Sequence, residues 1–494
     1  MKKILSIFLS ILMLTACLSM MAVPAGAADA ITADPTWYDE TKTTLVINDA
    51  ADLLAFSQQL NAGANTFSGK TVELAADIDL NPGWTASATA PTNIWGYKDV
   101  GAAGFWGTFD GKGHTISGIY CDFNSIQAGI FGNFAVKPDK RKDADGKFII
   151  ENVTIKNVAF VNSVMIVRGQ DTGGFYGYLA QGQSNDGTTY DTFNFENVYN
   201  GISIIGAAPS SNNKAGTAIA VGGFIGNCNT SGIAFNFKNC VYAGNMEIST
   251  MIHDKVGGFI GTTGTTQKPN VHTTYTNCAY YGNANIGADF FGCFVADGIR
   301  ADILKNCISA GIMNSTADPM DFIAGGLVHQ KNSGTTITDC LYTVTNGVNT
   351  PLGEEVSVAP EGTTFCKYAE LIGASAKTPA EGWTKTAGYA MPTALYDQFK
   401  TLLDAQTPVV PEGSNQPGDQ PADTDNDQPA DTGDSKPADT NDNTADTKAP
   451  ASDTKAPATE APTEEKGCGG VIGLGAVAIV GVAAVAVACK KKED

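Results

Sequence analysis

The sequence predicts an all-β protein: a right-handed parallel β-helix, or solenoid, with an N-terminal capping segment, an acidic disordered stalk and one C-terminal transmembrane helix. Three observations predict this organisation: strand-like motifs recur every 29 to 42 residues, one long segment lacks large apolar residues, and an apolar run lies near each end of the chain. The expected parts are a signal peptide (1–27), an N-terminal capping region (28–103), the repeats (104–350), a C-terminal capping region (351–404), the stalk (405–466) and the anchor with a short basic tail (467–494).

Two short elements recur within the repeats. One is a Gly-x-x-Gly element with an aromatic residue inside, and the other is Asn or Asp followed by Val or Cys. Copies of the first are Gly129–Gly132, Gly174–Gly177, Gly223–Gly226 and Gly258–Gly261, and copies of the second begin at Asn157, Asn197, Asn239, Asn277, Asn306 and Asp339. The second element recurs at spacings of 40, 42, 38, 29 and 33 residues, which are typical of solenoids. A propeller is the alternative, but it would need four strands per blade and more even spacing.

The residues around these elements have the pattern of strands. From Phe148 to Phe160 apolar and polar residues alternate, and β-branched residues are frequent, which favours strand over helix. The chain also has 55 glycines, which suits a fold with many tight corners.

Stacking of the repeats would place equivalent residues about 4.8 Å apart. The predicted inward-facing row is Val158, Val198, Cys240, Cys278, Cys307 and Cys340. Because valine occupies two positions of this row, the row needs a small apolar residue, and reduced cysteine behaves as one. Disulfides between repeats and a metal ladder are the alternatives to buried thiols. The predicted structural ladder of stacked amides, each bonded to the next, is Asn157, Asn197, Asn239, Asn277 and Asn306.

These motifs resemble those of bacterial cell-surface proteins with the GLUG repeat, in which a Gly-Gly-(Leu/Phe)-Val-Gly element precedes an Asn-Cys element. The stretch from Gly104 to Ile119 resembles the segment that leads such repeats, and Trp383 to Pro392 resembles their closing segment. The resemblance spans about Leu45 to Pro392, and the copies at Asp289 and Leu327 depart from the motif. It implies a parallel β-helix displayed on a bacterial surface, and says little about biochemical function.

The chain ends predict export and anchoring. A basic start, an apolar run and a small-residue site predict a signal peptide cleaved after Ala27; a lipobox ending at Cys17 is the alternative. Residues 411–466 contain 14 acidic residues, 4 lysines and no Val, Ile, Leu, Met, Phe, Trp, Tyr or Cys, so they are expected to be disordered. Residues 471–488 form an uncharged apolar run followed by three lysines, which predicts a transmembrane helix with a cytoplasmic basic tail.

These features favour a non-catalytic binding or adhesion protein on the surface of a bacterial, Gram-positive cell. The expected partners are an extracellular glycan or protein and, through the anchor, the membrane. The net charge of −20 argues against nucleic acid. No cofactor or metal site is predicted. Trp84, Trp95 and Trp106 are the candidate ligand-binding residues, as a sugar platform or, alternatively, as a cap on the core.

Two other functional classes stay open, a carbohydrate-active enzyme and a structural surface component. A glycosidase needs two facing carboxylates, and the candidates are Asp77 with Asp79, and Asp110, which the sequence places in a turn. A polysaccharide lyase would need a cation near a base, and the chain has only three arginines. No catalytic residue is therefore predicted. The tyrosines that follow the cysteine row are expected to form an outer stripe: Tyr242, Tyr280, Tyr281 and Tyr342.

Overall fold

The computed structural model describes residues 29–408 without 64–65, 96–103, 123–126, 133–142, 169–170, 180–189, 208–219, 229–232, 264–271, 298–300, 316–322, 331–333 and 344–361. The predicted signal peptide, all but the first four residues of the predicted stalk, and the predicted anchor lie outside the described residues. Within the described part of the chain, no helix is both long enough and apolar enough to cross a membrane.

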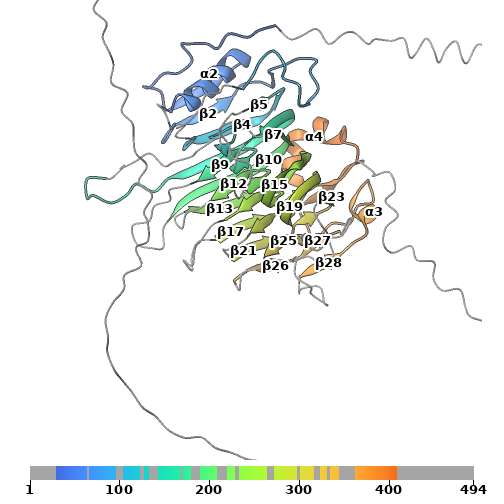
Figure 1. The fold of residues 1–494 in the computed structure, drawn as a ribbon. Coiled ribbons are helices and arrows are strands. Elements are labelled where there is room, and N and C mark those ends of the chain that lie inside the picture. The colour runs from blue at the N-terminus through green and yellow to red at the C-terminus, as the bar shows by residue number, and fades with distance from the viewer. Residues whose placement is uncertain are drawn as a thin grey trace, which may run out of the picture. The chain divides into compact units, whose positions relative to one another are not determined.

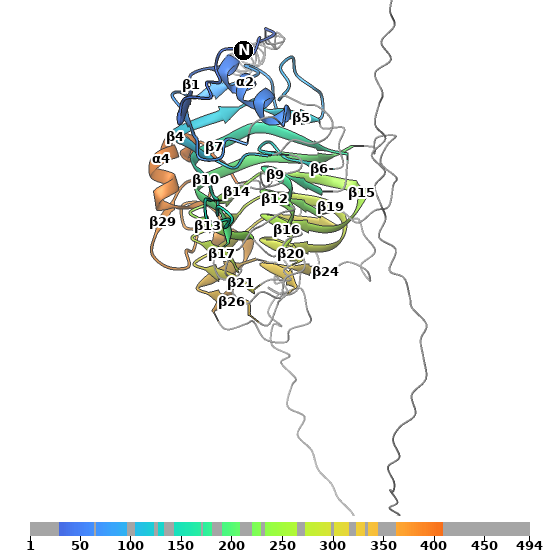
Figure 2. The ribbon, with the colours of Figure 1, turned by 90° about the vertical axis from the view of Figure 1, so that its left-hand side faces the viewer.

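Parallel β-sheets dominate the described residues, and strands account for 49% of the structure against 10% for helices, so the all-β prediction is confirmed. One sheet has 23 strands and a second has five, and their strand pairs are parallel. Figures 1 and 2 show the strands of successive repeats lying side by side down the molecule. Within the described part of the chain, β29 (Trp383–Lys385) and β30 (Ala390–Pro392) form an antiparallel hairpin outside these two sheets.

Each repeat begins with one path of strands, which is continuous in the first repeats and interrupted in the later ones. The continuous strands are β4 (Thr108–Ser117), β7 (Asn152–Val167) and β10 (Asp191–Gly206). The interrupted paths are β13 (Ile233–Lys238), β14 (Val241–Tyr242) and β15 (Met246–Gly257); β17 (His272–Thr276), β18 (Ala279–Tyr280) and β19 (Asn283–Gly292); β21 (Ala301–Lys305), β22 (Ile308–Ser309), β23 (Ile312–Ser315) and β24 (Ile323–Gly325); and β26 (Thr336–Thr338) with β27 (Cys340–Tyr342).

The remaining strands complete the repeats and the N-terminal end. Short strands before the Gly-x-x-Gly elements are β6 (Gln127–Ala128), β8 (Asp171–Gly173) and β11 (Ala220–Gly222). The five-stranded sheet consists of β9 (Tyr176–Leu179), β12 (Ile225–Cys228), β16 (Ile260–Thr262), β20 (Val295–Asp297) and β25 (Val328–Gln330). The N-terminal strands are β1 (Thr44–Ile47), β2 (Thr71–Leu74), β3 (Ile78–Asp79) and β5 (Tyr120–Asp122).

Equivalent residues of successive repeats pair in register, and each such set is called a row. The inward row that contains Phe195, Phe237 and Tyr275 follows from the alternation of the strands. The rings of Phe195 and Phe237 stack with centroids 4.6 Å apart and 7° between planes, and Tyr275 continues the stack at 5.0 Å. Because all three rings are buried, the row forms a continuous aromatic spine within the core.

The Gly-x-x-Gly element makes the corner between the two sheets. A Cβ on Gly223 would lie 2.1 Å from the carbonyl oxygen of Gly258 in the next repeat, so no residue with a side chain fits where the backbones approach. The aromatic residue of the element turns into the core, where Phe224 and Phe259 stack at 4.9 Å. The glycines therefore serve the corner, and the aromatic residue serves the core.

The N-terminal end of the stack is covered by α2 (Ala50–Asn61). The helix begins after Asp49, whose carboxylate accepts hydrogen bonds from the amides of Ala51 and Asp52, which is a favourable N-cap. On its buried side, Phe56 contacts Phe67, Trp95 and other rings. The helix therefore contributes its buried side to the hydrophobic core at this end of the stack.

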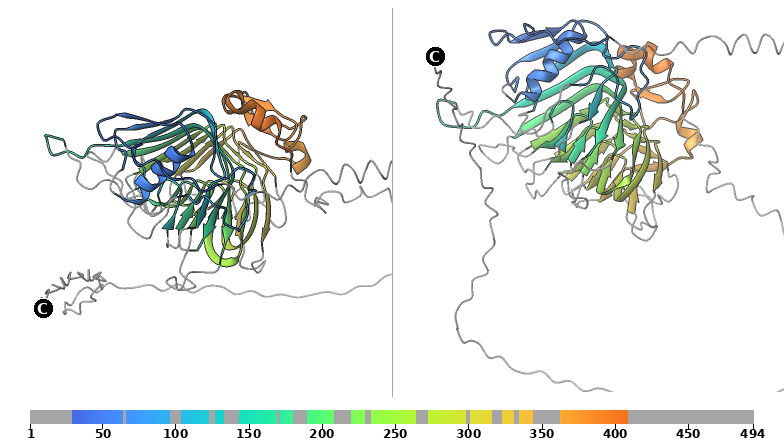
Figure 3. Two further views of the ribbon diagram at one scale, coloured as in Figure 1. Left: turned by 90° about the horizontal axis from the view of Figure 1, so that it is seen from above. Right: turned by 45° about the horizontal axis from the view of Figure 1, so that its top comes forward.

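The C-terminal region differs from the expected cap. β28 (Thr363–Phe365) pairs with β27 at the end of the stack, but the chain then runs back along one flank. This returning segment, residues 366–406, is called the strap, and it lies beside the stack in Figure 3. It comprises α3 (Tyr368–Leu371), β29 (Trp383–Lys385), β30 (Ala390–Pro392) and α4 (Thr393–Asp404). Since α4 contacts β4, β7 and β10, the strap covers the length of the repeats.

Candidate functional site

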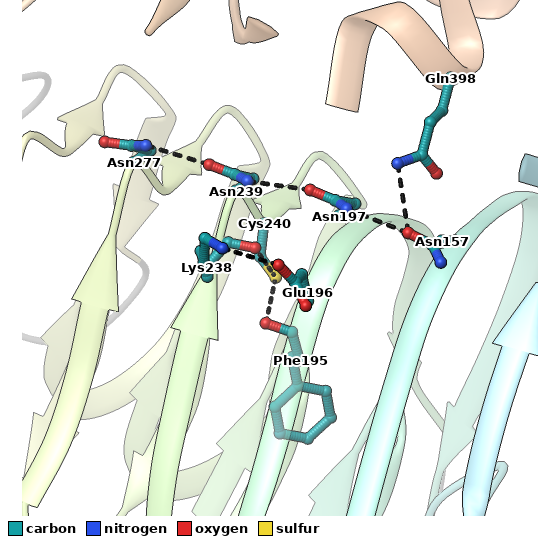
Figure 4. A network of polar contacts seen from close by, with 9 residues as sticks. All are labelled: Asn157, Phe195, Glu196, Asn197, Lys238, Asn239, Cys240, Asn277 and Gln398. Carbon is teal, nitrogen blue, oxygen red and sulfur yellow. Dashed lines mark hydrogen bonds and ion pairs between the residues drawn. The ribbon is translucent and has the colours of Figure 1, made fainter. Parts of the chain in front are cut away.

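The five predicted asparagines are brought together in one ladder of hydrogen bonds, of which Figure 4 shows four members. Each Nδ2 donates to the Oδ1 of the asparagine in the preceding repeat. The distances are 3.0 Å from Asn197 to Asn157, 2.9 Å from Asn239 to Asn197, 3.0 Å from Asn277 to Asn239 and 2.7 Å from Asn306 to Asn277. All four bonds run in the same direction, so the amide dipoles add along the ladder.

The backbone explains why this position favours asparagine. The five ladder residues have φ between 53° and 55°, a left-handed conformation that asparagine tolerates better than most residues. The same conformation continues at Asp339, with φ of 53°, and at Gly362, with φ of 83°. The left-handed residue bends the strand path, and in the third repeat it lies between β13 and β14.

The ladder ends on a carboxylate at its N-terminal side. Asn157 Nδ2 donates to Asp110 Oδ1 at 3.0 Å, and Asp110 also accepts a bond from the Lys112 amide. Burial would raise the pKa of Asp110, but these hydrogen bonds and the nearby charges of Lys156 and Lys112 hold the pKa below its usual value. Asp110 is buried within β4, directly before a bulge in which Lys112 and Gly113 have positive φ. The predicted corner is therefore present, but the carboxylate beside it is buried and bonded, not replaceable.

The other candidate carboxylates accept hydrogen bonds from backbone amides. Asp77 Oδ1 accepts a hydrogen bond from the Thr115 amide at 2.8 Å, and Asp79 Oδ1 accepts one from the Asn81 amide at 2.9 Å. Both residues are exposed. Asp77 therefore links the segment before β3 to β4, whereas Asp79 stabilises a local turn.

The four predicted cysteines form a buried row of free thiols. Val198 pairs with Val158 at the start of this row. Cys240 Sγ lies 3.3 Å from the carbonyl oxygens of Phe195 and Lys238, and the members Cys278, Cys307 and Cys340 make the same contact two residues back along their own strands. Burial raises the pKa of Cys278 well above its usual value, which keeps the thiol protonated.

The tryptophan platform is corrected by the structure. Trp95 and Trp106 are 2% and 1% exposed, and a buried ring cannot offer its face to a sugar. Trp95 instead donates to the Ile130 carbonyl oxygen at 3.2 Å, and Trp106 packs against Phe193. Trp84 is partly exposed, but its ring stands edge-on to Tyr120. Trp95 and Trp106 therefore belong to the core, as the capping alternative required.

One outward row of the repeats is apolar and lies under the strap. It comprises Ala159, Tyr199, Val241, Ala279, Ile308 and Leu341, each in register with the next. Leu395, Phe399 and Leu403 of α4 belong to the same buried cluster. Within this cluster Tyr281 donates to the Ala390 carbonyl oxygen. The expected outer stripe of tyrosines is wrong, because Tyr281 is under the strap and the other three are buried in the core: Tyr242, Tyr280 and Tyr342.

A second outward surface, on the other side of the ladder, is polar and open. It is called the open face and comprises Thr154, Lys156, Asn194, Glu196, Asn236, Lys238, Thr274 and Thr276. Asn236 Nδ2 donates to Asn194 Oδ1 at 3.0 Å, and Lys238 Nζ lies 2.8 Å from Glu196 Oε1. None of its members is buried, so the open face offers hydroxyl, amide and charged groups at regular intervals.

Sequence reasoning missed two polar pairs between the sheets, each with one buried carboxylate. Asn227 Nδ2 donates to Asp171 Oδ1 at 3.0 Å, and Lys255 forms an ion pair with Asp297. Burial raises the pKa of Asp171 to about 6, despite hydrogen bonds that lower it. These residues carry no recurrent motif, and only the pairing of the sheets reveals them. Within the described residues, His, Cys, Asp and Glu form no group of three that could hold a metal ion.

Comparisons with known proteins add no relative. No protein-family model, no curated protein and no solved structure matches the chain.

Proposed function

We propose that the protein is a membrane-anchored, surface-displayed, non-catalytic binding protein whose open face recognises an extracellular glycan or protein. In this proposal the repeats form a right-handed parallel β-helix of the GLUG type. The in-register pairing of successive repeats supports such a coil. The apolar chain ends and the acidic segment between the repeats and the C-terminal apolar run support display on a bacterial, Gram-positive surface.

The open face is the observation that carries the proposal. Its rows run in register through four repeats, with Thr154, Asn194, Asn236 and Thr274 in one row. Amides and hydroxyls can both donate and accept hydrogen bonds, which suits the hydroxyl groups of sugars and the polar surface of a protein. Because the rows repeat, an extended ligand could make the same contact several times.

Carboxylate geometry supports binding rather than glycoside hydrolysis. Asp110, the first acid to suspect, is buried and bonded to Asn157 and the Lys112 amide. It therefore ends the ladder, where it stabilises the fold. A carbohydrate-active enzyme is the competing function, and release of reducing sugar from plant, host or bacterial polysaccharides would support it.

The experiment measures binding and topology separately. The full chain, purified in detergent, is applied to a glycan array and to cell-surface proteins that have been separated by size and immobilised on a membrane. Asn236→Ala and Thr274→Ala on the open face should weaken binding, whereas Lys400→Ala on the strap should leave it unchanged. Protease added to intact cells should release the repeats. Equal binding by all three variants would contradict the open face as the site, and protection of the repeats until lysis would contradict surface display.

A further inference from the structure

The two ends of the asparagine ladder are built differently. At the N-terminal end, Asn157 Nδ2 meets the carboxylate of Asp110 at 3.0 Å, so the last donor has an anionic acceptor. Lys112 and Lys156 each lie 3.5 Å from the other oxygen of that carboxylate. The positive end of the aligned amide dipoles therefore meets a negative charge, and that charge is itself compensated.

At the C-terminal end of the ladder, the last amide oxygen has no donor. Asn306 uses its Nδ2 to bond Asn277 Oδ1 at 2.7 Å and the Glu381 carbonyl oxygen at 2.9 Å. Its Oδ1 is buried and has no hydrogen-bond partner, and the residue is 6% exposed. Leaving a buried acceptor unpaired costs about 1–3 kcal/mol of stability, so a donor or a cation bound to this oxygen would stabilise the fold.

Asp339 occupies the next position of the ladder. The pairing of Lys305 with Thr338 and of Ile308 with Leu341 places Asp339 beside Asn306, and its φ of 53° repeats the ladder conformation. Neighbouring parallel strands lie about 4.8 Å apart. A carboxylate has no proton to donate at neutral pH, so the residue at this position offers only acceptors, where the corresponding residue of the other rungs offers an amide donor.

We propose that the Asn306–Asp339 end of the ladder binds a hard cation, of which Ca²⁺ fits best. Ca²⁺ prefers carboxylates, asparagine carbonyls and backbone carbonyls, and it accepts irregular geometry completed by water. Asp339 supplies the carboxylate, Asn306 the amide oxygen, and the exposed side chain of Asp339 an entry from solvent. The cation would lie at the negative end of the aligned amide dipoles, just as the carboxylate of Asp110 lies at their positive end.

The test uses the metal-free full chain in detergent and follows thermal unfolding by circular dichroism. Millimolar Ca²⁺ should raise the unfolding temperature of the wild type by about 2 °C or more. Asp339→Asn should raise the unfolding temperature without Ca²⁺, because the new amide donates to Asn306 Oδ1, and it should abolish the response to Ca²⁺. Asp339→Gly should also abolish the response, and its backbone fits the left-handed position, as Gly362 does.

Controls separate this site from general effects of charge. Asp145→Asn, at an exposed turn elsewhere, should respond to Ca²⁺ as the wild type does. Mg²⁺ should act more weakly, since it demands regular octahedral geometry, and NaCl at the same ionic strength should have no comparable effect. An equal response in wild type and Asp339→Asn, an equal effect of NaCl, or no response of the wild type would each overturn the proposal.

Discussion

The apolar outward row under the strap, called the covered flank, and the open face belong to the same repeats, but only the covered flank is buried. On the covered flank the outward row is Ala, Tyr, Val, Ala, Ile and Leu, and the strap buries it. On the open face, only a few residues earlier in each repeat, the rows contain Thr, Asn, Lys and Glu. The difference teaches that the backbone pairing of the repeats does not decide which surface is free; the side chains on each row do.

The asparagine ladder marks the boundary between these two surfaces. Lys156 and Ala159 flank the ladder residue Asn157, and the same order holds at Glu196 and Tyr199 around Asn197. The strap reaches this boundary, since Gln398 Nε2 donates to Asn157 Oδ1 at 3.2 Å and Asn306 bonds the Glu381 carbonyl oxygen. The left-handed bend therefore separates a packing surface from an exposed one.

The largest expected effect comes from breaking the covered flank. Leu395→Ala removes a fully buried side chain from α4 and should lower the free energy of unfolding by roughly 2–5 kcal/mol. Urea unfolding followed by tryptophan fluorescence measures this loss. Lys400→Ala, on the exposed side of the same helix, should change it by less than about 0.5 kcal/mol. Equal values for the two variants would show that the strap contributes no packing.

The boundary should be the next most sensitive region. Asn239→Ala removes two ladder bonds and places alanine at a φ of 54°, at a cost of roughly 2–3 kcal/mol. Asn239→Gly loses the same bonds without the backbone strain, so it should cost about 1 kcal/mol less. If alanine and glycine are equally destabilising in urea, strain at the bend is not the reason for asparagine.

The anionic end of the ladder should matter less, but measurably. Asp110→Ala leaves Asn157 without its acceptor and removes an ion pair from Lys156 and from Lys112, which keeps its pair with Glu73, so we expect a loss of about 2 kcal/mol. Asp110→Asn keeps an acceptor oxygen and should lose less. Because the pKa of Asp110 is below that of the unfolded chain, its contribution is present above the unfolded pKa and is lost as the pH falls through the folded pKa. A wild-type stability that stays constant from pH 6 to the acid limit, about pH 2, would contradict this role.

The buried thiol row should tolerate a conservative change. Cys278→Val introduces the residue that already occupies the row at Val158 and Val198, and the cost should be below about 1.5 kcal/mol. A loss of several kcal/mol, together with a mass change on reduction of the wild type, would show that the row forms disulfides.

The smallest effect on stability is expected on the open face. Asn236→Ala removes an exposed amide and its bond to Asn194, and it should change the free energy of unfolding by less than about 0.5 kcal/mol. Binding of an extracellular ligand should fall in this variant while unfolding in urea stays the same. A destabilisation comparable to that of Leu395→Ala would remove the distinction between the two flanks.

The repeat period, the strand character and the two stacked rows follow from the chain alone. The Asn-Cys motif recurs because one residue must adopt a left-handed bend and the next must face inward, and both requirements are local. The alternation of side chains along a strand likewise suffices to place Phe195 and Phe237 in the core. Such features can be predicted from the sequence because the same residue types recur at the same position in each repeat.

Tertiary structure decided the features that do not repeat. The strap carries ordinary helix and hairpin sequences, and only long-range packing lays Leu395 against the row that includes Ala159 and Tyr199. Trp95 and Trp106 are tryptophans of the kind that either bind sugars or fill a core. Phe56 of α2 packs against Trp95 and Phe193 packs against Trp106, so both rings belong to the core. The ladder has Asp110 at one end and an unpaired Asn306 oxygen at the other. This direction depends on whether each amide nitrogen points toward the preceding or the following repeat, and the spacing of asparagines in the sequence does not specify that orientation.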